Sequence, residues 1–136
     1  TRFMMTLDQS VELVMYAFEN GQGGEIFVQK APAAKVGDVA KVLIDTLADP
    51  EHPISIIGKR HAEKDYESLL SSEEMTTAED LGKFFVVKND TRDLNYIKYT
   101  SKGENDRYGA LDYNSNNTTQ MSLLEIKQIL LSAGII

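Results

Sequence analysis

Two arginines in this chain have the type and the placement needed to hold a phosphate group from two sides. Arg2 lies a few residues before a predicted helix, and Arg60 follows a short apolar run and Gly58. Ligand sites in α/β folds gather at such ends of secondary elements. The guanidinium group is a planar fork of N–H donors that matches phosphate oxygens, so two of them could clamp a diphosphate. Taken singly, each arginine is more often a solvated surface residue.

Three further residues could complete a nucleotide site. An ionised Glu63 could accept hydrogen bonds from both hydroxyl groups of a ribose, and the alternative is an exposed carboxylate paired with Lys64. Phe27 and Val28 lie in a predicted strand that could face a base, and the alternative is that this strand is core on one face. These residues predict the binding of a nucleotide and not its chemical conversion.

No group of residues in the sequence predicts catalysis within this chain. No Tyr is followed four positions later by Lys, no Gly-x-Ser-x-Gly occurs, and the glycines within residues 21–24 do not match a phosphate loop. His52 and His61 stand apart without metal-ligand spacing, so no metal is assigned. We therefore expect no catalytic, cofactor-binding or metal-binding residue here.

The composition limits the kinds of molecule that the chain could bind and the place where it could act. The chain has 136 residues, of which 42% are hydrophobic, and a net charge of −7. An acidic chain argues against a nucleic-acid surface, which needs a concentrated basic patch. It contains no run of about 18 apolar residues that would predict a membrane span. It also lacks cysteine, which fits a cytoplasmic location.

Three helices are predicted from apolar residues at helical spacing. The first begins at a capping box opened by Thr6 and ends before Gly21. The second covers residues 36–47, and the third covers residues 122–132 from a capping box opened by Ser122.

Short runs of β-forming residues predict strands between these helices. Residues 25–29 and 54–57 flank the second helix, and the second of these runs has the pattern of a strand buried on both faces. This β-α-β order predicts a small α/β layer with parallel pairing. Two more strands are expected at residues 66–70 and 84–87. Residues 89–120 are polar with interspersed aromatic residues, which favours a segment that wraps another surface.

Five segments of the chain form an ordered set of motifs. They are TRFMMTLD (1–8), GEIFVQK (24–30), IGKRHAEK (57–64), TRDLNY (91–96) and DYNSNNT (112–118). In this order they resemble the C-terminal part of bacterial polysaccharide-biosynthesis enzymes that act on nucleotide sugars. These enzymes are extended short-chain dehydrogenase/reductases, and this sequence is most similar to the UDP-N-acetylglucosamine 4,6-dehydratase/5-epimerases of capsule and O-antigen pathways. The resemblance covers essentially the whole chain.

The resemblance implies a small, mixed α/β substrate-binding lobe. The N-terminal Rossmann domain, with NAD or NADP and the catalytic Tyr and Lys, would lie outside this chain. Arg2 and Arg60 would contact the diphosphate of UDP, and Glu63 would lie near the uridine ribose. Many such dehydratases have a loop that reads Arg-Pro-Gly-Glu-Lys, whereas residues 60–64 read Arg-His-Ala-Glu-Lys, so the Pro and Gly that constrain the loop are replaced.

The predicted organisation and function follow from this resemblance. Residues 1–88 would form the UDP-sugar-binding lobe, and residues 89–136 a C-terminal extension with a wrapping segment and a final helix. The predicted protein is a homo-oligomeric UDP-N-acetylglucosamine 4,6-dehydratase/5-epimerase that uses NAD or NADP, of which this chain is a part that is inactive alone. A UDP-sugar 4-epimerase of the same superfamily and a noncatalytic binding or assembly module are the alternatives.

Overall fold

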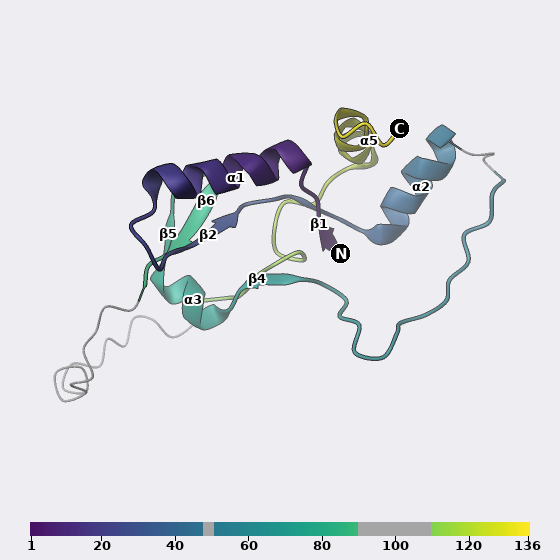
Figure 1. The fold of residues 1–136 in the computed structure, drawn as a ribbon. Coiled ribbons are helices and arrows are strands. Elements are labelled where there is room, and N and C mark those ends of the chain that lie inside the picture. Colours follow the sequence, from purple (N-terminus) through teal and green to yellow (C-terminus); the bar gives the residue numbers. More distant parts are fainter. Residues whose placement is uncertain (48–50, 90–109) are drawn as a thin grey trace. The chain divides into compact units, whose positions relative to one another are not determined.

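The computed structural model of the protein describes residues 1–47, 51–89 and 110–136, which form short sheets and helices in mixed order (Figure 1). The predicted mixed α/β class is confirmed. The chain divides into two compact units, each of which is described by itself. The first unit comprises Thr1–Glu12, Ala31–Ser68 and Asn114–Ile136, and the second comprises Leu13–Lys30 and Leu69–Tyr113.

The three predicted helices are confirmed as α1 (Leu7–Asn20), α2 (Val36–Leu47) and α5 (Leu123–Ser132). Their caps form as the sequence indicates. The Thr6 amide donates to Gln9 Oε1 at 2.9 Å, and the Gln9 amide donates to Thr6 Oγ1 at 3.3 Å. These reciprocal bonds satisfy amide groups that a helix start otherwise leaves without partners.

The first unit has its core between α2 and α5. Val42 and Ile126 are 5% and 0% exposed and belong to one hydrophobic cluster, which also holds Ala34 of β3 (Ala33–Ala34). β1 (Arg2–Phe3) runs antiparallel to β3, and Arg2 is the register partner of Ala34. The strand that carries Arg2 is thus paired with a strand whose residue Ala34, opposite Arg2, packs in the core.

The second unit is built on a three-stranded antiparallel sheet. Its strands are β2 (Ile26–Gln29), β6 (Phe84–Val87) in the centre and β5 (Ala78–Asp80). The part of α1 from Leu13 onward belongs to this unit and lies over the sheet (Figure 1), where the Tyr16 ring meets Phe84 with 4.5 Å between centroids. The remaining elements are α3 (Ser72–Thr77) and the paired strands β4 (Ser68–Leu70) and β7 (Tyr113–Asn114).

The predicted strand at residues 54–57 and its parallel pairing are wrong. Residues 52–60 carry no strand, and Ile54, Ile56 and Ile57 are 54%, 92% and 78% exposed. A strand needs a neighbour for its backbone, and the strand that pairs with β2 is β6, in antiparallel register. The strand predicted at 66–70 is confirmed in its second half, as β4, and the strand at 84–87 is confirmed as β6.

The C-terminal extension is described only from residue 110 onward. Most of the predicted wrapping segment, including the motif at 91–96, lies outside the described residues. The described part returns to the first unit, where the Ala33 amide donates to Thr119 O at 2.9 Å and the Met121 amide donates to Ala33 O at 2.8 Å. The predicted division at residue 88 stays a prediction. None of the helices within the described ranges is long and apolar enough to cross a membrane.

Candidate functional site

Arg2 lies at the centre of a polar network in the first unit. Its side chain is 33% exposed. Nη2 donates to Lys64 O at 3.1 Å, while Nη1 donates to Thr1 O at 2.8 Å and, at 3.4 Å, to Asp65 O. Because these carbonyl groups belong to two separate parts of the chain, Arg2 connects the N-terminal segment to residues 64 and 65.

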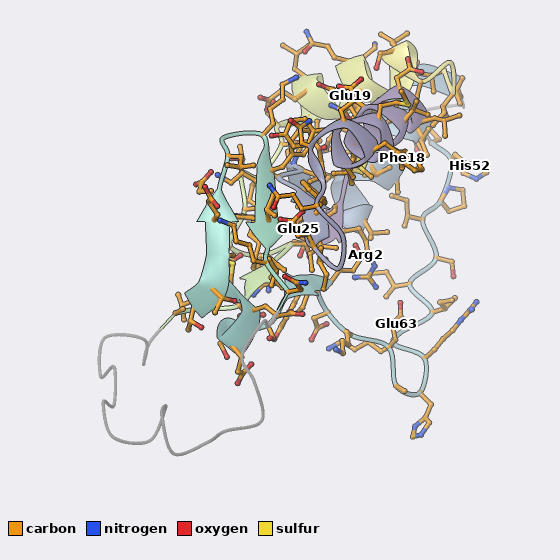
Figure 2. All side chains as sticks on the ribbon, turned by 60° about the vertical axis from the view of Figure 1, so that its left-hand side comes forward. Arg2, Phe18, Glu19, Glu25, His52 and Glu63 are labelled. Atoms are coloured by element: carbon orange, nitrogen blue, oxygen red, sulfur yellow. The ribbon has the colours of Figure 1, made fainter. Side chains whose placement is uncertain are left out.

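Two carboxylates share the charge of Arg2. Glu63 Oε1 lies 3.6 Å from Nη2, and Glu67 Oε1 lies 3.6 Å from Nε. Figure 2 labels Arg2 and Glu63, which come from β1 and from the long irregular segment before β4. The Glu67 carboxylate also accepts a hydrogen bond from the Phe3 amide at 3.1 Å. An anionic ligand at Arg2 would therefore have to compete with two carboxylates already in place.

Residues 60–63 form a closed turn that presents the second arginine. The Glu63 amide donates to Arg60 O at 3.0 Å, and the Arg60 amide donates to Glu63 Oε2 at 2.9 Å. Within residues 1–47, 51–89 and 110–136 the Arg60 guanidinium has no ion-pair or hydrogen-bond partner. The carboxylate of Glu63 thus joins the backbone of Arg60 to the side chain of Arg2, and its ion pair is with Arg2 instead of Lys64.

The turn holds Ala62 at φ 65°, a left-handed conformation that strains a residue with a Cβ. We expect Ala62→Gly to raise the free energy of unfolding by about 0.5 kcal/mol, because relief of strain exceeds the entropy that glycine adds to the unfolded chain. Urea denaturation measures the change. The control is Ala78→Gly, at a position with φ −68°, which should destabilise instead. Equal effects of the two substitutions would contradict strain at Ala62.

Lys59 and Asp65 form an ion pair across the base of this loop. Lys59 Nζ donates to Asp65 Oδ2 at 2.7 Å, and this hydrogen bond is the first reason that the pKa of Asp65 lies below its usual value. A depressed pKa stabilises the fold at pH values above the unfolded pKa, about 3.9, and this contribution is lost as the pH falls through the folded pKa. We expect Asp65→Asn to be less stable than the wild type above pH 5, with the difference vanishing in acid. A carboxyl titration by NMR that placed Asp65 above its usual pKa would contradict this ordering.

The sequence did not single out Glu67 and Ser115, which complete the network. Ser115 is fully buried; its Oγ accepts from the Glu67 amide at 3.0 Å and donates to Thr1 O at 3.1 Å. Ser115, from the predicted motif at 112–118, thus contacts both the N-terminal residue and the segment that contains Glu67, as Arg2 does. A signal for Glu67 was present, because acidic residues at 63, 65 and 67 repeat with the period of an extended chain.

The other two predicted site residues lie on β2 in the second unit. Val28 is 7% exposed, which supports the core interpretation of this residue. Phe27 is half-buried and meets the Tyr16 ring edge-on, with 5.9 Å between centroids. It also lines an apolar pocket of about 430 Å³. Phe27 remains a predicted contact of a base, and Val28 a predicted residue of the same site.

The described residues do not fit a dinucleotide cofactor. In dinucleotide-binding folds a glycine-rich loop leads from a strand into a helix N-terminus, where amide groups face the pyrophosphate. The glycines within residues 21–24 lead instead from the C-terminus of α1 into β2. No chemical step is therefore assigned to a cofactor on these residues. The described ranges also contain no group of three or more His, Cys, Asp or Glu side chains placed to hold a metal ion.

Comparison with known proteins places every part of the sequence in one family. The family model described as "Polysaccharide biosynthesis protein" matches residues 1–89, and the one described as "Polysaccharide biosynthesis protein C-terminal" matches residues 90–136. The first match alone covers more than half of the chain.

Similar curated proteins are named UDP-glucose 4-epimerase. Those of Rickettsia canadensis and Rickettsia bellii are 50% identical over 132 residues, and that of Rickettsia typhi is 48% identical. Each alignment covers 97% of this chain but only 38% of the relative, so the chain spans well under half of the relatives' length.

A solved structure shares the fold. The crystal structure of Pen from Bacillus thuringiensis superposes with a TM-score of 0.78 at 28% identity, over 98% of this chain and 38% of that one. The matches to the sequence and to the fold agree, and the chain belongs to the polysaccharide biosynthesis protein family.

Proposed function

We propose that this chain is the UDP-sugar-binding part of a nucleotide-sugar epimerase or dehydratase that uses NAD or NADP. The observation that carries the proposal is the joined arrangement of Arg2, Glu63 and Arg60 in the first unit. The names of the relatives, which concern a UDP-hexose, support the same class of substrate.

Within this arrangement the arginines have different parts. Arg60 offers an exposed guanidinium with all of its N–H donors available within the described residues, so it is the first candidate for the diphosphate. Arg2 keeps the loop in place through Glu63 and is the second candidate. In a chain with a net charge of −7, local cations rather than the overall field must attract a diphosphate.

Glu63 can still serve a ribose in this proposal. Each carboxylate oxygen has two acceptor positions, and the partners of Glu63 are one Arg2 nitrogen and the Arg60 amide. A diol could bind at the remaining positions, since the carboxylate is 42% exposed. Phe27 is proposed as a contact of the base, and Val28 as a support beneath the same strand.

Two reactions are compatible with this substrate class. The names of the relatives favour 4-epimerisation, as in a UDP-glucose 4-epimerase. The motifs at residues 1–8 and 57–64 resemble those of UDP-N-acetylglucosamine 4,6-dehydratase/5-epimerases, whose reaction is loss of water, but these motifs do not separate the two reactions. The proposed enzyme is cytoplasmic and homo-oligomeric, and the residues that decide between the two reactions belong to the remaining part of the polypeptide.

Mass spectrometry of the reaction products distinguishes these functions. The full polypeptide whose reading frame contains this sequence is incubated with UDP-N-acetylglucosamine and, separately, with UDP-glucose. A product lighter by one water supports the dehydratase, and an isobaric product separated by chromatography supports the epimerase. Binding of either UDP-sugar without conversion supports the noncatalytic module. If neither UDP-sugar binds or reacts, the proposed function is wrong.

A further inference from the structure

Two carboxylates lie beside the Arg2 guanidinium without forming a hydrogen bond to it. Glu63 Oε1 is 3.6 Å from Nη2, and Glu67 Oε1 is 3.6 Å from Nε. Both distances exceed the usual N–H···O length of about 2.9 Å. A phosphate oxygen that approached the same nitrogen atoms could form a shorter, charge-assisted hydrogen bond. The two carboxylates therefore compete with an anionic ligand for Arg2, and their other contacts decide which of them yields.

Glu67 is fastened to the strand that carries Arg2. Its carboxylate accepts a hydrogen bond from the amide of Phe3, the residue that follows Arg2 in β1. Its backbone is held at both polar groups by Ser115. The Glu67 amide donates to Ser115 Oγ at 3.0 Å, and the Ser115 amide donates to Glu67 O at 2.8 Å. Because Ser115 is fully buried, Glu67 is fixed beside Arg2.

Glu63 is fastened instead to the turn that carries the other arginine. Its Oε2 accepts a hydrogen bond from the Arg60 amide at 2.9 Å, while its Oε1 reaches Arg2 only through the longer ion pair. Glu63 thus bridges the turn and Arg2. A diphosphate held by both arginines would compete with Oε1 for Nη2 and take over this bridge. Oε2 would keep the Arg60 amide, and Oε1 would become available to a ribose hydroxyl group.

We propose that Glu63 makes the site selective for a nucleoside diphosphate over inorganic pyrophosphate by exchanging Arg2 for the ribose, while Glu67 stays on Arg2. Any diphosphate that contacts Nη2 displaces Glu63, and only a ligand with a ribose offers the displaced carboxylate new hydrogen bonds. Pyrophosphate breaks the same ion pair without that gain. Specificity is a difference of affinities, and a group that opposes the wrong ligand contributes to it. The inference rests on the proposed UDP-sugar site and adds a basis for rejecting free phosphates.

Competitive calorimetry on the full polypeptide tests the exchange. UDP is titrated alone and in the presence of pyrophosphate, which gives the Kd of each ligand at the same site. Glu63→Gln removes the charge that faces Nη2 and weakens the ribose acceptor. The matched control, Glu67→Gln, removes a charge at the same distance from the same guanidinium and keeps an acceptor for the Phe3 amide. A UDP analogue that lacks both ribose hydroxyl groups repeats the test on the wild type, so that it does not depend on the folding of a variant.

Glu63→Gln is expected to lower the selectivity for UDP over pyrophosphate about tenfold, because UDP binds more weakly and pyrophosphate more tightly. Glu67→Gln acts on Arg2 and not on the ribose, so it should leave the ratio of the two Kd values within about twofold of the wild type. In the wild type the analogue should bind about tenfold more weakly than UDP.

Four results would overturn the inference: an unchanged ratio in Glu63→Gln, weaker binding of pyrophosphate in that variant, an equal change of the ratio in both variants, or equal Kd values of UDP and the analogue in the wild type. Absence of UDP binding to the wild type would contradict the proposed function itself, so the two failures are distinguishable.

Discussion

Replacing Ile126 with alanine is expected to lower the free energy of unfolding by about 3 kcal/mol. Ile126 is 0% exposed and packs with Ala34, Val42 and Leu130 in the core of the first unit. The substitution removes buried methyl and methylene groups, so the free energy gained by transferring them out of water is lost. The cavity that remains adds a further cost. The same cluster fixes β3, and with it the register partner of Arg2. Loss of this side chain should therefore also loosen the candidate site.

The matched control is Leu124→Ala on the same helix. Leu124 is 66% exposed, so its truncation should change the free energy of unfolding by less than about 0.5 kcal/mol. Urea denaturation of the polypeptide gives both values, and hydrogen exchange of the α5 amides localises the effect. Similar losses at positions 124 and 126 would contradict the assignment of Ile126 to the core.

The helices could be predicted because their signals are local. A capping box and an apolar stripe fall within four to twelve consecutive residues, as in the start of α1 at Thr6 or of α5 at Ser122. The buried residue of α2 is Val42. The apolar stripe predicted for this helix omitted it, since that stripe consisted of Val36, Val39, Ala40, Leu43 and Leu47. The burial of Val42 depends on α5, more than 70 residues later in the sequence, and helical spacing in α2 alone cannot identify that contact.

The strand at residues 54–57 could not be predicted correctly from its composition. Three β-branched apolar residues favour a strand, but the structure leaves Ile56 92% exposed. A run of residues forms a strand only where a neighbouring strand can pair with its backbone. The neighbour of β2 is β6, which begins at Phe84. The sequence pattern is the same whether or not such a neighbour is available.

The candidate site was predictable in its residue types and not in its connections. An arginine at the end of a predicted secondary element indicated anion binding at both Arg2 and Arg60. The ion pairs of Arg2 with Glu63 and Glu67 span more than 60 residues along the chain, and a sequence pattern does not show which cation and carboxylate meet. The resemblance of the ordered motifs to a known family predicted that Arg2 and Glu63 belong to one site. It did not indicate that the two side chains form an ion pair.

These contacts indicate different roles for the two arginines. Arg2 donates to three backbone carbonyl groups and lies near two carboxylates, so much of its capacity is used within the fold. The side chain of Arg60 makes no such contacts with the described residues. Truncation of Arg2 should thus disturb the loop, whereas truncation of Arg60 should act on the ligand alone. The two variants therefore need both an affinity and a stability measurement.

Arg60→Ala in the full polypeptide is expected to raise the Kd for a UDP-sugar about 10- to 150-fold, which corresponds to about 1.5 to 3 kcal/mol for a charge-assisted contact. Its free energy of unfolding should stay within about 0.5 kcal/mol of the wild type, because the side chain has no partner within the described residues. Isothermal titration calorimetry and urea denaturation measure the two quantities. Arg60→Lys keeps the charge and loses the planar fork, so it should recover only part of the affinity.

Arg2→Ala should weaken UDP-sugar binding by a similar factor and, unlike Arg60→Ala, also lower the free energy of unfolding by about 1 kcal/mol. The stability loss is modest because the ion pairs of Arg2 are partly exposed to water. A change in stability without a change in Kd would show that Arg2 only holds the loop, which would leave Arg60 as the contact of the diphosphate. Unchanged Kd values in both variants would contradict the diphosphate assignment, since loss of a guanidinium group that contacts a phosphate must weaken its binding.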